Sequence, residues 1–173
     1  MVKFKNGFTD ARLNETHALH RDDDSELSHR WPSRVPLRAV HQAITKEWWR
    51  KRRRYFDLRI SQLVEDECSA GDLKAAAARM IPLKRISRLE ITDQAIVIAE
   101  EIIRRHALPA RAAKDALHVA IAATHGVHFP LTWNCTHLNN GEIYPKVKAL
   151  CEKHGCACPV IVTPAELMGA TEL

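Results

Sequence analysis

The sequence predicts a single-domain α/β fold, a three-layer α/β/α sandwich around a parallel sheet. From residue 31 onward, segments with strand-like alternation take turns with longer segments of helical periodicity, which is typical of parallel sheets covered by helices. The chain of 173 residues is long enough to bury a core. Hydrophobic residues make up 46% of it and charged residues 27%, the balance of an ordinary globular protein.

The chain changes character near residue 31. Residues 1–30 have no sustained period and contain the acidic run Asp22 to Asp24, so we expect a divergent, poorly ordered segment there and the domain at 31–173. The first ten residues lack the pattern of a secretory signal, and no segment approaches the roughly 20 apolar residues of a membrane span. We therefore expect a cytoplasmic protein that does not contact membranes.

Helical periodicity and capping residues define the expected helices. Thr92 is a cap for the helix that follows it, whose apolar face carries Ile96, Ala99, Ile102 and Ile103. Thr163 and Pro164 have the residue types that open a short terminal helix. The helices are expected at residues 37–54, 62–68, 72–80, 93–107, 111–125, 141–154 and from 164 onward.

Four short segments have the composition of strands. They lie at residues 56–60, 88–91, 129–133 and 160–162. Pro130 is unfavourable within the third of these, because proline cannot donate a hydrogen bond to a neighbouring strand. Each of these strands is followed by at least one expected helix, as is typical of the α/β class.

Polar residues that could carry chemistry occur in three places. They are the acidic triplet Glu65-Asp66-Glu67, Asp115 within an alanine-rich helix, and the segment Thr132 to His137 just after an expected strand. Ligands of open α/β sheets bind beyond the carboxyl ends of the strands. A carboxylate at Asp115 is costly unless it is paired or bound to a cation. Taken alone, Asp115 fits a helix cap or a buried salt bridge equally well, and Glu67 is more typical of an exposed position on a solvated helix.

The motifs of this chain resemble those of the PIN-domain toxins of bacterial type II toxin–antitoxin systems, the VapC-like family. Residues 36–168 carry the resemblance in a fixed order, about three quarters of the chain. The motifs are Asp115 to Ala120 (Asp-Ala-Leu-His-Val-Ala), Leu131 to Cys135 (Leu-Thr-Trp-Asn-Cys), Thr163 to Leu167 (Thr-Pro-Ala-Glu-Leu), His41 to Trp49, and Ser61 to Val64.

The resemblance implies a Mg²⁺- or Mn²⁺-dependent endoribonuclease that an antitoxin protein neutralises, with a homodimer as a further possibility. Members of the family hold the metal with clustered carboxylates, ligands that suit hard cations. Glu67 corresponds to the second acid and Asp115 to the third, so both are the expected metal ligands. Asn134 stands where many relatives have an aspartate, and it is the third expected catalytic residue. His118 is interpreted as a core residue or as a support of the site.

The amino terminus departs from the family pattern. The first acid of the family lies on an apolar first strand, and we expect that strand to be missing here. Asp22 to Asp24 are more typical of a solvated segment than of a site. Possible codons for His20 to Arg30, displaced by one nucleotide, permit Ile-Glu-Thr-Thr-Ile-Pro-Ser-Tyr-Leu-Thr-Ala, which resembles the first strand and loop of the family. We hypothesise a pair of compensating frameshifts, in the gene or in its reading.

These observations leave the enzymatic activity of the chain open. The main alternative is an inactive PIN-like remnant that acts only through an antitoxin or self-association, and a third class is a basic RNA-binding module without hydrolysis. The net charge of +5 favours an anionic partner only weakly. Cys151, Cys156 and Cys158 with His154 invite a zinc site, but their spacing is more typical of free thiols. The run Arg50 to Arg54 fits a solvated helix end.

Overall fold

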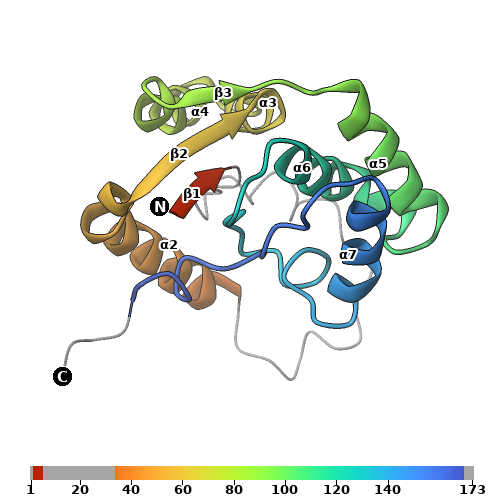
Figure 1. Ribbon diagram of the computed structural model, residues 1–173. Coiled ribbons are helices and arrows are strands. Elements are labelled where there is room, and N and C mark those ends of the chain that lie inside the picture. Colours follow the sequence, from red (N-terminus) through yellow and green to blue (C-terminus); the bar gives the residue numbers. More distant parts are fainter. Residues whose placement is uncertain (1, 6–33, 170–173) are drawn as a thin grey trace.

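The computed structural model describes residues 2–5 and 34–169 of the chain (Figure 1). Its sheet has three parallel strands in the order β1 (Val2–Lys5), β2 (Phe56–Ser61) and β3 (Ser87–Leu89). Helices connect β2 to β3 and follow β3. Parallel pairing combined with intervening helices confirms the α/β class that the sequence predicts.

The presence of β1 corrects the expectation that the first strand is missing. Val2 lies opposite Phe56 and Lys5 lies opposite Arg59, so the strand runs in parallel beside β2 at the edge of the described sheet. The alternation of apolar and basic residues covers only these four positions, too few for a strand to be inferred from period alone. The acidic run Asp22 to Asp24 and the segment with the displaced reading lie outside the described residues.

Six α-helices account for most of the regular structure that is described. Their bounds agree to within a few residues with six of the expected helices; the expected helix from residue 164 onward is the exception. They are α2 (Arg34–Lys51), α3 (Gln62–Ser69), α4 (Leu73–Met80), α5 (Asp93–Arg104), α6 (Ala113–Thr124) and α7 (Tyr144–Lys153). Short 3₁₀ turns occur at η1 (Arg53–Tyr55), η2 (Ile81–Leu83) and η3 (Ala110–Ala112). Thr92 caps α5 as predicted, accepting a hydrogen bond from the Ala95 amide at 3.1 Å.

The two expected strands at 129–133 and 160–162 pair with each other but do not form a regular ladder. The Thr132 amide donates to the Val162 carbonyl at 2.9 Å and the Val162 amide donates to the Pro130 carbonyl at 3.0 Å, around a single parallel bridge between Leu131 and Val162. The Val160 amide still reaches the His128 carbonyl. Pro130 has no N–H to donate to the Val160 carbonyl in return, and this missing donor interrupts the ladder.

The expected terminal helix is a turn. The Thr163 hydroxyl and amide both bond to Glu166 Oε2, at 2.8 and 2.7 Å, and the Glu166 amide lies 3.4 Å from the Thr163 hydroxyl. These reciprocal contacts are those of a helix-capping box. The described chain turns over Pro164–Leu167 without forming an α-helix, so the capping residues were identified correctly and the element was not.

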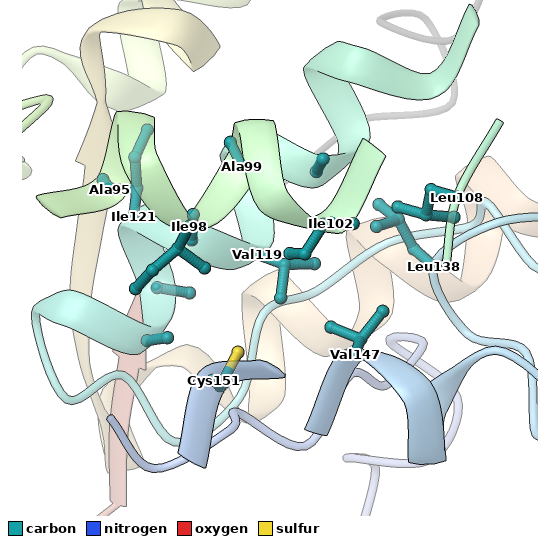
Figure 2. Packing of buried hydrophobic residues seen from close by; sticks show 14 of the residues in the cluster. Ala95, Ile98, Ala99, Ile102, Leu108, Val119, Ile121, Leu138, Val147 and Cys151 are labelled. Atoms are coloured by element: carbon teal, nitrogen blue, oxygen red, sulfur yellow. The ribbon is translucent and has the colours of Figure 1, made fainter. Parts of the chain in front are cut away.

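The largest apolar core lies between α5, α6 and α7 (Figure 2). Ile98 and Ile102 of α5 are fully buried against Val119 and Ile121 of α6. Ile96, which the sequence placed on the buried face, is 42% exposed. Ile96 and Ile98 are separated by about 200° around a helix, so the buried face of α5 is centred on Ile98 and Ile102 instead.

A second cluster ties α2 to the bridge between residues 131 and 162. Trp48 of α2 is fully buried with Leu131 and Val162, and Phe56 and Leu58 of β2 pack against them. This contact fixes the position of Leu131 just before the segment with the predicted site residue Asn134. No helix in the described part of the chain combines the length and apolar character needed to cross a bilayer.

Candidate functional site

The three acidic residues after β2 lie on α3 in three different environments. Ser61, the last residue of β2, caps α3 by accepting a hydrogen bond from the Val64 amide. Glu65 forms an ion pair with Arg88 at 2.6 Å, and Asp66 is exposed. Glu67 is turned inward, with only 13% of its side chain exposed. Of the three acids, Glu67 is therefore the one that reaches the space between α3 and α6.

His118 of α6 is the residue that Glu67 contacts. Its Nε2 atom lies 3.3 Å from Glu67 Oε2 and 3.4 Å from Oε1. The imidazole is 13% exposed, and its Nδ1 atom is buried without a hydrogen-bond partner among the described residues. The sequence interpretation of His118 as core or support thus left out its main contact. The signal was present, because a residue three positions after Asp115 shares its helical face.

Asp115 lies in the first turn of α6, where helices favour negative charge. The helix has no side-chain cap at Ala112, and the carboxylate interacts favourably with the positive end of the helix dipole. Asp115 is half-buried, whereas its alanine-rich surroundings had predicted a mostly buried position. Its Oδ2 atom accepts a hydrogen bond of 3.0 Å from the side-chain amide of Asn134.

Asn134 is held in one orientation by the backbone around it. Its amide N–H bonds to the Thr132 hydroxyl at 3.0 Å, and its side-chain oxygen accepts from the His137 amide at 3.1 Å. The side-chain nitrogen is therefore the atom that faces Asp115. The side-chain oxygen, which is the atom that could bind a cation, faces the His137 amide within the loop instead.

The loop that carries Asn134 is anchored to α2. The Trp133 indole N–H donates to the Thr45 hydroxyl at 3.0 Å, and the indole stacks on His41 with ring centroids 3.9 Å apart and planes at 7°. Burial lowers the pKa of His41, which favours a neutral ring in the stack. No local sequence pattern predicts this anchor, since it joins residues that are 88 positions apart.

The described residues do not complete a divalent-metal site. Glu67 and Asp115 supply the carboxylate oxygens that Mg²⁺ or Mn²⁺ prefers. The oriented amide of Asn134 presents a donor rather than an acceptor to Asp115. Over residues 2–5 and 34–169, there is no group of three or more histidine, cysteine, aspartate or glutamate side chains that could hold a metal ion. The structure instead pairs each expected ligand with a protein group, Glu67 with His118 and Asp115 with Asn134.

A second charged cluster, around Glu101, lies away from this site and links two helices. Glu101 of α5 is 5% exposed and contacts Lys153 Nζ at 2.7 Å and His154 Nε2 at 2.5 Å. Hydrogen bonds from Lys153 and then His154 lower the pKa of Glu101 to about 2. This ion pair joins the ends of α5 and α7 and does not involve Glu67 or Asp115.

Comparison with known proteins identifies the family. A family model described as PIN domain matches residues 35–129, more than half of the chain. The matched segment contains Glu67 and Asp115 and ends before Asn134. No curated protein and no solved structure matched the chain. PIN domains have a nuclease-type fold, in agreement with the parallel sheet and helices found here. The chain therefore belongs to the PIN-domain family.

Proposed function

We propose that this chain is the toxin of a toxin–antitoxin pair and that its site is built for RNA cleavage dependent on Mg²⁺ or Mn²⁺. We further propose that the chain as written cleaves RNA poorly, because one acidic ligand is lacking. The observation that carries this proposal is the partner of Asp115. Its carboxylate receives the amide of Asn134, and the described residues place no group of three ligating side chains around it.

The charge balance of a phosphodiester site explains why one missing acid matters. Carboxylate charge largely determines the affinity of a protein for Mg²⁺, which gives up its water reluctantly. The negative charge that gathers during phosphodiester cleavage then has no cation to offset it. Glu67 and Asp115 would be the protein ligands of such a cation. With His118 beside one of them and Asn134 beside the other, both are already engaged with protein groups.

Three proteins test the proposal. The first is the chain with its present sequence (the written chain), and the second has residues 20–31 replaced by those of the displaced reading frame (the restored chain). The third is the restored chain carrying Asp115→Asn. Cleavage of total RNA is measured with Mg²⁺, with Mn²⁺ and with chelator. We expect metal-dependent cleavage only from the restored chain. Equal rates for the written and restored chains would refute the idea of a damaged site and would make Asp22 to Asp24 serious candidates for the missing ligand.

A pair of neighbouring acids gives a matched control within the restored chain. Glu67→Gln removes the carboxylate that faces α6, whereas Glu65→Gln removes one that is paired with Arg88. We expect the first variant to lose at least tenfold in cleavage rate and the second to keep its rate. If both lose equally, the loss reflects the stability of α3 and not the site.

The alternative function is binding without catalysis, and exposed apolar residues favour it. Leu37 and Val40 of α2 are 57% and 52% exposed, and Leu73 of α4 and Ile81 after it are 84% and 66% exposed. Exposed apolar side chains mark a surface that another protein covers where they lie together, and Leu37 and Val40, three residues apart, share one face of α2. Light scattering of the written chain, alone and with a co-expressed antitoxin candidate, tests this alternative. Binding of RNA that is unchanged in chelator would instead favour the basic RNA-binding module.

A further inference from the structure

Three of the five cysteines gather beside the end of α7. Cys151 is fully buried and belongs to the core between α5, α6 and α7, where Figure 2 shows its sulfur directed toward the other core residues. Cys156 and Cys158 are partly buried and pack against the same core. All three are free thiols, and none of them belongs to the site around Asp115.

A glycine turn brings Cys158 back to α7. Gly155 has φ +72°, its amide bonds to the Glu152 carbonyl at 2.9 Å, and the Cys156 amide bonds to the Cys151 carbonyl at 3.0 Å. These bonds are those of a left-handed helix ending, which reverses the chain. Tyr144 and Cys151 lie on one face of α7 because they are seven residues, about two turns, apart. The returning Cys158 forms side-chain hydrogen bonds with both of them.

The two bonded thiols differ in acidity. The hydrogen bond from Cys151, aided by one from Tyr144, lowers the pKa of Cys158 against the opposing effect of burial. The same hydrogen bond and burial raise the pKa of Cys151. Cys158 is also the partly exposed member of the pair, whereas Cys151 is fully buried. Cys158 is therefore the thiol that a reagent in solution can reach, and its thiolate is the form that attacks electrophiles. Cys151 remains a protonated neighbour within reach.

The third thiol is engaged elsewhere. Cys156 Sγ donates to the His154 carbonyl at 3.7 Å and receives the Gln94 side-chain amide at 3.6 Å. The cluster does not form a zinc site among the described residues, since no group of histidine, cysteine, aspartate and glutamate side chains there could hold a metal ion. The geometry therefore separates one bonded thiol pair, Cys151 with Cys158, from a neighbour of similar exposure.

We propose that Cys158 and Cys151 form a dithiol site that reacts with hydroperoxides and closes to a disulfide. The Cys158 thiolate attacks one oxygen of hydrogen peroxide, the O–O bond breaks, and hydroxide leaves, which takes up a proton to become water. The Cys151 sulfur then attacks the Cys158 sulfenic acid, forms the S–S bond and releases a second water. Two thiols are oxidised and one peroxide is reduced to two waters, in the order known for a thiolate beside a resolving cysteine.

The disulfide would tie α7 to the segment that ends the domain. Val160 and Val162 of that segment pair with residues 128–132, the strand that leads to the Trp133 loop. Cross-linking residues 151 and 158 closes a short loop of the unfolded chain and raises the melting temperature, by roughly 5 °C for a chain of this size. The proposal concerns thiol chemistry alone and does not depend on ribonuclease activity.

The experiment uses the full reduced chain, treated with hydrogen peroxide at neutral pH and then alkylated. We expect the mass of the protein to fall by about 2 Da before alkylation and two thiols to be protected. Trypsin cuts after Lys148 and Lys153, so the disulfide should join the peptide with Cys151 to the peptide that begins at His154. The Cys156→Ser variant should form the same cross-link, and Cys158→Ser should not.

Cys135 provides an internal comparison, because it is the most exposed cysteine of the five. Burial and the charge of Glu166 raise the pKa of its thiol, so we expect it to be oxidised more slowly than Cys158. The proposal is overturned if Cys156→Ser abolishes the cross-link, if Cys158→Ser retains it, or if peroxide oxidises Cys135 first. Should Cys158→Ser fail to fold by circular dichroism, the peptide maps of the wild-type and Cys156→Ser proteins decide the matter.

Discussion

Replacing Asn134 with aspartate tests whether the contact with Asp115 belongs to a metal site. The substitution keeps the shape of the side chain and exchanges the amide donor for a second carboxylate. In the wild-type chain the amide nitrogen lies 3.0 Å from Asp115 Oδ2. The variant therefore replaces a hydrogen bond with two neighbouring negative charges. It also supplies a second carboxylate at the proposed metal site, in place of the Asn134 amide.

The expected destabilisation follows from that distance. Two charges about 3 Å apart repel by about 1.4 kcal/mol in a medium as polarisable as water, the appropriate limit for the half-exposed Asp115. Loss of a hydrogen bond to a charged group adds about 1.5 kcal/mol. In chelator we expect Asn134→Asp to lower the free energy of unfolding by about 2–3 kcal/mol, which lowers the melting temperature by about 5–10 °C. Mg²⁺ or Mn²⁺ should reverse most of this loss, because a cation that binds only the folded state stabilises it.

A second asparagine provides the control. Asn139 donates its side-chain amide to Glu166 Oε2 at 3.0 Å on an exposed surface. Asn139→Asp creates the same like-charge contact outside the predicted site, where we expect a loss below about 1 kcal/mol and little recovery with metal. The assay is thermal unfolding of both variants across a metal titration. If metal stabilises Asn134→Asp no more than Asn139→Asp, then Asp115 and residue 134 are not a metal-binding pair.

Three further predictions concern stability. Because the pKa of Glu101 is lowered from 4.5 to about 2, its ion pair stabilises the fold above pH 4.5 and is lost as the pH falls toward 2; the melting temperatures of wild type and Glu101→Gln should therefore converge over that interval. Ile98→Ala should cost about 3 kcal/mol in urea unfolding because Ile98 is 0% exposed, while Ile96→Ala, at a 42% exposed position, should cost under about 1 kcal/mol; equal costs would contradict the assigned buried face of α5. Thr92→Ala removes the cap of α5 and should cost about 1 kcal/mol, whereas Thr92→Asn should restore it.

The helices and β2 were predicted well because the sequence signals that define them lie within or next to each element. Periodicity and a cap such as Thr92 act within a few residues of the element that they define. The errors occurred where the outcome depends on pairing with a distant segment. β1 is an edge strand that exists through its contact with β2, and the ladder at residues 129–133 is limited by the missing N–H of Pro130. The turn at Thr163 shows that a capping box does not by itself produce a helix.

The candidate site was predicted by residue type and resemblance, but its contacts were not. The structure places Asn134 beside Asp115, whereas the roles of Glu67, Asp115 and Asn134 in catalysis stay predictions. The contact between Glu67 and His118 joins residues that are 51 positions apart, and the orientation of the Asn134 amide depends on its loop. Sequence spacing predicts neither this contact nor this orientation, because both follow from how α3, α6 and the loop pack together.

The position of β1 has a consequence for the order in which the protein folds. Its partner β2 lies more than fifty residues further along the chain, whereas β2 and β3 are joined by the local segment with α3 and α4. Closing the longer loop costs only slightly more free energy, but contacts between distant residues form more slowly. The unit from β2 to β3 can therefore assemble first and serve as the template on which β1 docks. As a four-residue strand at the sheet edge, β1 should also be among the first segments to exchange its amide hydrogens in the folded protein.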